Sequence, residues 1–140
     1  MSEFINEHFV PAQVHIRDQK AVFTRFGASW TPTQILLDPQ GEEQHRIEGF
    51  LPAEDFLAQL ELGLGKIEFH DQHFPEAKRK FRAVCEGYPK SGGAAEACYW
   101  AGVAAYKETD DPQHLGAAGE LLKRRYPESE WARKASVWLH

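Results

Sequence analysis

The chain has 140 residues, of which 42% are hydrophobic and 12% aromatic, and this composition is typical of a folded globular protein rather than a disordered one. Its formal net charge is -5, with basic and acidic residues interleaved along the chain, which argues against a nucleic-acid surface because such a surface needs clustered basic residues. No stretch approaches the roughly 20 apolar residues that cross a bilayer, and the start, MSEFINEHF, lacks the basic and apolar regions of a secretion signal.

The first part of the chain alternates between helical and strand patterns. Residues 4–9 have the spacing of a helix end, and residues 10–16 (VPAQVHI) alternate apolar and polar side chains as a strand does. Residues 21–26 predict a short helix, closed by Gly27 at a position that favours a left-handed cap. Residues 35–37 (ILL) then predict a strand that is buried on both faces, because the run does not alternate.

A hairpin and a helix follow this strand. Residues 38–41 (DPQG) predict a turn, because aspartate caps its own turn, proline presets φ and glycine accepts positive φ. Residues 43–50 are the expected antiparallel partner strand, and Pro52 opens a helix that runs through Leu64.

From residue 65 onward the pattern is helical, and it contains an internal repeat. Tyr88 and Tyr126, 38 residues apart, each begin the pattern YPxSxxAxxAxxW, which ends at Trp100 and Trp138. The proline ends one helix, the serine caps the next, and the small alanines let neighbouring helices approach closely. The tryptophans are expected to fill the groove that remains.

The helical part resembles the tetratricopeptide family, in a subtype found in bacterial envelope-assembly proteins. The consensus positions are occupied by Gly65, Phe74, Ala77, Phe81, Val84 and Pro89 in one repeat and by Gly102, Tyr106 and Pro127 in a second. Leu115 and Gly119 depart from the consensus, so the second helix pair is expected to be irregular. Gly63 and Gly65 (LGLGK) are interpreted as a hinge between a unit at residues 1–64 and helical repeats at residues 65–140.

Residues 4–64 resemble the thioredoxin family. The segment 29–38 (SWTPTQILLD) is similar to the one in which that family places a cis proline before a buried strand, so the resemblance implies a cis Thr31–Pro32 bond. The implied fold class is α/β, a truncated thioredoxin-like βαββα unit, followed by all-α helix pairs. The family's first strand and its CxxC motif are absent, which removes the basis for thiol-disulfide chemistry in the chain as given.

The missing strand is central in the family's sheet, so its loss implies an incomplete sheet with unpaired backbone groups. A second copy of the chain, a rearranged pairing, a partner protein or a longer native chain could each fill the gap. We take a homo-oligomer with exchanged or abutting strands as the hypothesis.

Metal, cofactor and redox sites are not expected. Cys85 and Cys98 are interpreted as reduced and structural, since they lie far apart in helical surroundings. Glu68, His70 and His73 place two histidines beside a carboxylate, but we interpret them as a solvated turn because a metal site needs further ligands.

The resulting hypothesis is a non-catalytic module that binds a protein or peptide partner. In active thioredoxin relatives the residue before the cis proline offers its backbone to an extended peptide, so Trp30, Thr31 and Pro32 are the candidate peptide-binding residues. The alternative role of Trp30 is packing against a neighbouring helix. The alternative function is the distal part of a thiol-disulfide oxidoreductase whose CxxC lies upstream. The chain as given is expected in the cytoplasm, although relatives of both halves work in the periplasm as well.

Overall fold

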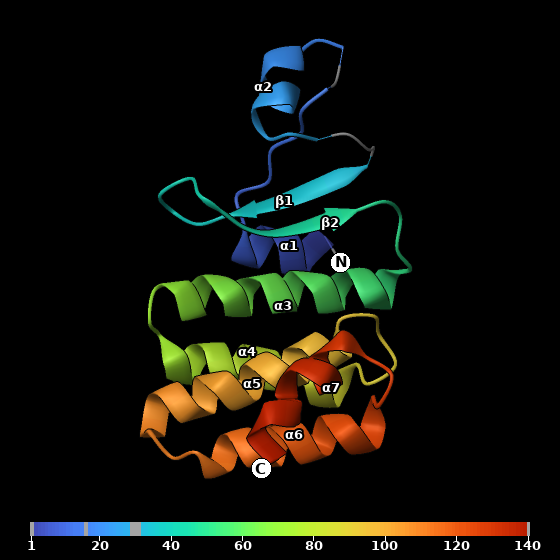
Figure 1. Cartoon of the computed structure of the whole chain (residues 1–140). Helices are drawn as coiled ribbons and strands as arrows, with labels where there is room; N and C mark the ends of the chain where they lie inside the picture. The colour runs from blue at the N-terminus through green and yellow to red at the C-terminus, as the bar shows by residue number, and fades with distance from the viewer. Residues whose placement is uncertain (1, 16, 29–31, 140) are drawn as a thin grey trace.

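A computed structural model describes residues 2–15, 17–28 and 32–139, and it places a small α/β unit on a stack of antiparallel helices (Figure 1). The elements in chain order are α1 (Ser2–His8), α2 (Lys20–Arg25), β1 (Thr33–Leu37), β2 (Glu43–Glu48), α3 (Ala53–His70), α4 (Phe74–Gly87), α5 (Ala94–Thr109), α6 (Gln113–Arg125), α7 (Glu130–Ala135) and a final 3₁₀ turn η1 (Ser136–Leu139). The predicted lack of strands after residue 64 is confirmed for the described residues.

The strands β1 and β2 form an antiparallel hairpin in which Gln34 lies opposite Ile47. The predicted turn between them is confirmed: Oδ1 of Asp38 accepts the backbone N–H groups of Gln40 at 3.0 Å and of Glu42 at 2.9 Å. These charge-assisted bonds hold the turn closed and lower the pKa of the Asp38 carboxyl group.

One face of this hairpin packs on α1 and α3. Leu36, Ile47 and Leu60 form its buried core. The aromatic and aliphatic side chains packed around that core are Phe4, Ile5, Phe9, Phe56 and Ile67. The prediction that residues 35–37 are fully buried is wrong, because successive strand residues point to opposite faces and Leu37 remains 39% exposed.

The segment between α1 and α2 differs from the predicted strand at residues 10–16. Residues 10–15 have no strand partner among the described residues, and Val10 and Val14 are 98% and 43% exposed. An isolated extended segment has no neighbour to take its backbone hydrogen bonds, and Pro11 lacks an N–H donor altogether. The predicted short helix at residues 21–26 is confirmed as α2, with Gly27 at a φ of 62°.

The helix α3 runs without interruption through the predicted hinge, so that interpretation is wrong. A Cβ atom at Gly63 would lie 2.3 Å from Cδ2 of Leu36, and one at Gly65 would lie 2.6 Å from the Phe81 ring. Both glycines are therefore packing positions: Gly63 lets the hairpin approach α3, and Gly65 lets α4 approach it.

The helices α3 to α7 enclose the larger core. Its fully buried large side chains include Leu62, Phe81, Val84 and Leu122. The buried alanines are Ala58, Ala77, Ala97, Ala101, Ala104 and Ala135. Small residues at the contacts let the helices pack closely, as the repeat pattern predicts.

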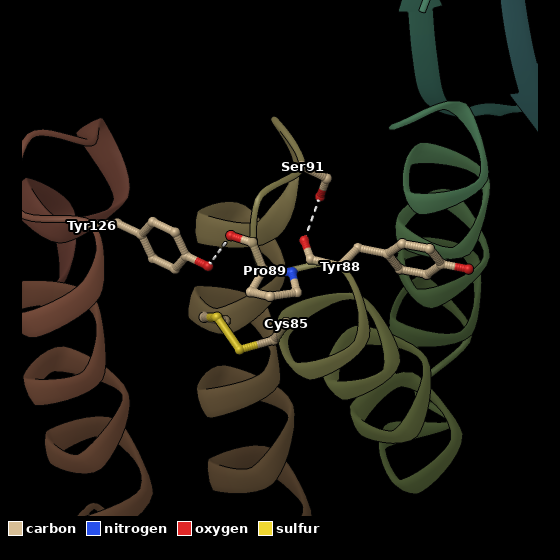
Figure 2. The surroundings of a disulfide bond; sticks show 6 residues. Cys85, Tyr88, Pro89, Ser91 and Tyr126 are labelled. Atoms are coloured by element: carbon tan, nitrogen blue, oxygen red, sulfur yellow. Dashed lines mark hydrogen bonds between the residues drawn. A yellow bond between two sulfur atoms is a disulfide. The ribbon is translucent and has the colours of Figure 1, made fainter. Parts of the chain in front are cut away.

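Cys85 and Cys98 form a disulfide between α4 and α5, so the interpretation of both as reduced thiols is wrong (Figure 2). Their Cα atoms are 5.0 Å apart although their sequence separation is 13. The chain reverses between the two helices, which brings the last turns of α4 beside the first turns of α5.

The two YPxS junctions form similar turns. Oγ of Ser91 donates to the carbonyl oxygen of Tyr88, and Oγ of Ser129 donates to that of Tyr126, both at 2.8 Å. The predicted serine cap is confirmed at α7, where Oγ of Ser129 accepts the N–H of Ala132, whereas α5 begins without a side-chain cap. The Tyr126 hydroxyl donates to the carbonyl oxygen of Pro89, which joins one junction to the other (Figure 2).

Candidate functional site

Of the three predicted peptide-binding residues, only Pro32 lies in the described part of the chain. It precedes β1, is half-buried, and accepts the Gly49 N–H at its carbonyl oxygen at 2.8 Å. Trp30, Thr31 and the Thr31–Pro32 bond lie outside the described residues. Their peptide-binding role and the cis bond therefore stay predictions.

A second candidate is a row of half-buried aromatic rings on α3, α5 and the C-terminal segment, here called the aromatic surface. The ring centroids of Phe69 and Trp100 are 5.4 Å apart, and those of Trp100 and Trp131 are 6.3 Å apart. Tyr99 lies 5.1 Å from Trp131 and 4.7 Å from Trp138. Edge-to-face and stacked pairs at these distances stabilise one another and hold the rings in fixed orientations.

A pocket of about 270 Å³ lies at one end of the aromatic surface. Its lining residues are Gln44, Lys66, Phe69, His70, Phe81 and Trp100. They come from β2, α3, α4 and α5, so both parts of the molecule contribute to it. The mixture of apolar walls and a few polar groups is typical of sites that accept a side chain or a small ligand.

A polar network holds the ammonium group of Lys66 in position beside this pocket. Nζ of Lys66 lies 2.7 Å from Oε1 of Glu96 and donates to Nδ1 of His45 at 3.1 Å. Because Nδ1 accepts that bond, Nε2 of His45 carries the proton and donates to Oε1 of Gln59 at 2.7 Å. Burial, followed by the nearby Lys66 charge, lowers the pKa of His45 and keeps its ring neutral.

The indole N–H of Trp100 adds an unused donor near the same place. It is buried and has no acceptor among the described residues. Such a group costs free energy unless an acceptor is supplied.

Glu68, His70 and His73, which the sequence analysis considered as metal ligands, do not come together in one cluster. Nδ1 of His73 lies 2.8 Å from Oε2 of Glu68, which raises the pKa of His73. Nε2 of His70 instead lies 3.9 Å from Oδ2 of Asp38 and 3.8 Å from Oε2 of Glu42. The ligand atoms of these last three residues lie within 4.8 Å of one another, but the Asp38 carboxylate is already used by the turn.

Sequence reasoning found only part of the aromatic surface. The repeat pattern identified Trp100 and Trp138 because they recur in register. Trp131 has no counterpart, since Gly93 occupies the equivalent position, and Phe69 and Tyr99 lie outside the repeated positions. Only the packing of the helices shows that these five rings share one surface.

Fold and site together define an α/β hairpin unit continuous with stacked helix pairs that carry an aromatic surface. Residues 1–63 match the family model of a thioredoxin-like domain, so the N-terminal unit is thioredoxin-like. Comparisons with curated proteins and with solved structures gave no match. In the described part of the chain, no helix has the length and apolar character required to cross a membrane.

Proposed function

We propose that this protein is a non-catalytic module that binds a protein or peptide partner on the aromatic surface. The observation that carries the proposal is the continuous row of half-buried rings from Phe69 to Trp138, which ends at a pocket large enough for a side chain. Aromatic residues are the usual anchors of protein interfaces, because they bury a large area at a small cost in conformational entropy.

The chemistry beside the rings indicates the kind of peptide. Nζ of Lys134 lies 4.1 Å from the centroid of the Trp131 ring, and Lys66 lines the pocket. A partner with an apolar anchor next to an acidic or carbonyl-rich stretch would complement the Lys134 ammonium group, whereas Lys66 is already paired with Glu96.

Redox chemistry by the described residues is not part of this proposal. Cys85 and Cys98 are joined to each other, and they are only 5% and 2% exposed. Thiol-disulfide exchange needs an accessible thiolate, which a buried disulfide does not offer.

Selection of a random peptide library on the whole protein tests the proposal. Peptides that bind are then measured by fluorescence anisotropy against the wild type and the Trp131→Ala variant. Loss of a central aromatic anchor is expected to weaken binding by about 30-fold. Phe50→Ala is the control, because Phe50 is an aromatic residue that is 90% exposed and lies after β2, outside the aromatic surface.

Two results would contradict the proposal. The first is a library that yields no binding peptide. The second is a set of peptides whose affinity falls equally in Trp131→Ala and Phe50→Ala. Peptides whose affinity is unchanged in both variants but falls when Pro32 is mutated would instead favour the predicted peptide-binding residues Trp30, Thr31 and Pro32.

The second candidate function is the distal part of a thiol-disulfide oxidoreductase whose CxxC lies upstream of this chain. The match of residues 1–63 to a thioredoxin-like domain favours it. The chain as given should not reduce insulin above background, while a longer native chain with an upstream CxxC should. Activity of the chain as given would contradict both candidate functions, because neither assigns it a reactive cysteine pair.

A further inference from the structure

The outer edge of β1 carries unused backbone groups. The register pairs Gln34 with Ile47 and Leu36 with His45, and Gly49 donates to Pro32 across the same pair of strands. Backbone groups alternate in direction along a strand, so the N–H and C=O of Ile35 point away from β2. None of the described residues bonds to them.

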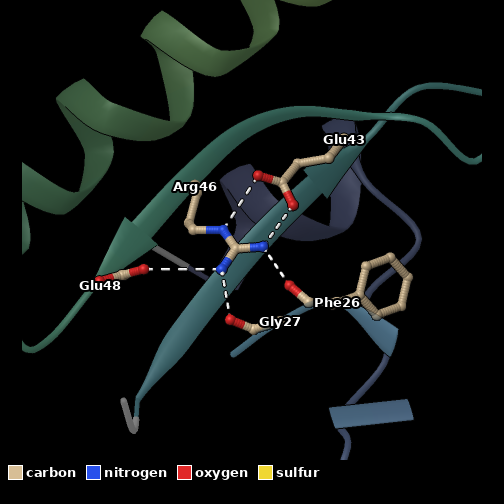
Figure 3. A network of polar contacts seen from close by, with 5 residues as sticks. All are labelled: Phe26, Gly27, Glu43, Arg46 and Glu48. Atoms are coloured by element: carbon tan, nitrogen blue, oxygen red, sulfur yellow. Dashed lines mark hydrogen bonds and ion pairs between the residues drawn. The ribbon is translucent and has the colours of Figure 1, made fainter. Parts of the chain in front are cut away.

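Two features that normally protect a sheet edge, charged residues and proline, are missing from β1. Its sequence, TQILL, has neither a charged residue nor a proline, whereas β2, EQHRIE, carries the charged residues Glu43, Arg46 and Glu48 (Figure 3). The irregularity in the ladder adds an extra residue to β2, since Leu36 lies opposite His45 and Leu37 opposite Glu43. The middle of β1, at Ile35, is therefore regular, uncharged and without a backbone partner among the described residues, which is the kind of edge that pairs with another strand.

The surroundings of this hairpin are also the more apolar part of the surface. Of the six large hydrophobic side chains that are well exposed in the described residues, five lie in the N-terminal unit. They are Val10, Val14, Leu37, Phe50 and Leu51. Concentrated apolar exposure of this kind marks interaction surfaces.

The β1 edge is complementary to itself. Ile35 is the central residue of the five-residue strand. If two copies meet antiparallel about a two-fold axis at this residue, each Ile35 N–H donates to the C=O of Ile35 in the other copy. The two Ile35 side chains then lie side by side on one face, and an apolar pair at such a position stabilises a sheet.

We infer that two copies of this chain pair through β1, antiparallel and with Ile35 opposite itself, to form one continuous four-stranded sheet. The partner at this edge is thus a second copy of the chain. This interface is separate from the aromatic surface and does not depend on the proposed function.

Light scattering of the whole protein across a concentration series is the first test. The expected mass at high concentration is twice 15.9 kDa. Ile35→Lys places two ammonium groups against each other on the axis, and it should weaken the dimer by about 100-fold. Val137→Lys, the same kind of change at a 67% exposed position in η1, away from the β1 edge, should leave the mass unchanged.

A charge-exchange experiment tests the register. Ile35→Lys and Ile35→Glu should each be monomeric alone, and an equimolar mixture should recover the dimer only if residue 35 faces residue 35. Circular dichroism of each variant establishes that it is folded. A wild type that is monomeric at every concentration, or a mixture that stays monomeric while both variants are folded, would overturn the inference.

A cross-link keeps the inference testable if the charged variants do not fold. Ile35→Cys adds one free thiol to a chain whose two native cysteines are already joined. Directly opposed residues of a hydrogen-bonded antiparallel pair have Cα atoms about 5.5 Å apart, within the range that a disulfide spans. Mild oxidation should yield a covalent dimer that Val137→Cys, with its thiol on η1, does not form, and the absence of this product would overturn the proposed pairing.

Discussion

The disulfide between Cys85 and Cys98 should be a major contributor to the stability of the helix pairs. It closes a loop with 13 residues of sequence separation, which includes the whole YPxS junction between α4 and α5. In the chain-entropy account, a loop of this length raises the free energy of unfolding by about 3 kcal/mol. Reduction removes that constraint but leaves both sulfur atoms in place, so no cavity cost is added.

Urea unfolding, followed by tryptophan fluorescence and far-UV circular dichroism, measures this contribution. To reduce the disulfide completely, the protein is unfolded and then refolded in the presence of reductant, because the buried sulfur atoms are poorly accessible in the folded state. With a slope of about 1 to 3 kcal/mol per molar urea, the midpoint should fall by about 1 to 3 M. Three of the four tryptophans, Trp100, Trp131 and Trp138, lie in the helices and the final turn that this disulfide helps to hold, so fluorescence reports mainly on that part.

Cys85→Ala is the companion variant, since it breaks the disulfide under oxidising conditions. It should lose at least as much stability as reduction does, because it also leaves a small cavity at a residue that is 5% exposed. Complete reduction, verified by thiol titration, with a loss below about 1 kcal/mol would refute the entropic argument.

Two further changes test the packing and the polar network. Gly65→Ala should destabilise the fold by about 1 to 3 kcal/mol in the same urea titration, because the new Cβ would lie 2.6 Å from the Phe81 ring. Gly116→Ala in α6 is the control, and it should be neutral or stabilising because the nearest neighbour of its new Cβ lies 3.9 Å away. His45 has a pKa below its unfolded value of 6.5, so the unfolded chain binds more protons and stability should fall as the pH drops below about 6.5, by at most about 1.36 kcal/mol per pH unit. Replacing His45 by Gln should flatten this part of the profile, and an unchanged profile would show that other groups cause the loss.

The sequence predicted elements whose signals are local. The turn at residues 38–41 and the helix α2 follow from side chains that act within a few residues, and the helical pattern after residue 64 is strong because it is long. The repeat predicted where the helices join, and the YPxS turns form at both junctions.

The predictions that were wrong all concern residues whose neighbours in the fold come from distant parts of the sequence. Residues 10–15 alternate as a strand does, but a strand needs a neighbour, and the described residues provide none. Gly63 and Gly65 looked like a hinge until their neighbours, Leu36 and Phe81, were placed. The Cys85–Cys98 pair was missed for the same reason, because only the reversal of the chain brings the two thiols together.

The helix α3 explains why the two parts of the molecule behave as one. Leu60 faces the hairpin core, whereas Ala58 and Leu62, two positions to either side, face the helical core. Residues two apart on a helix point in nearly opposite directions, so this single helix contributes buried side chains to both cores.

A division of the chain after residue 64 would therefore cut α3, and it would separate the α3 side chains from the rest of the helical core. It would also separate Gln44 from the helical residues of the pocket. We therefore propose that the predicted boundary at residues 64 and 65 does not separate two units that fold independently with their cores intact. We expect the fragment 65–140 to show much less helix and cooperativity than the same residues in the whole chain. Equal helicity and an equal unfolding midpoint in the fragment would refute this reasoning, because they would show that the helical core does not need Ala58 and Leu62.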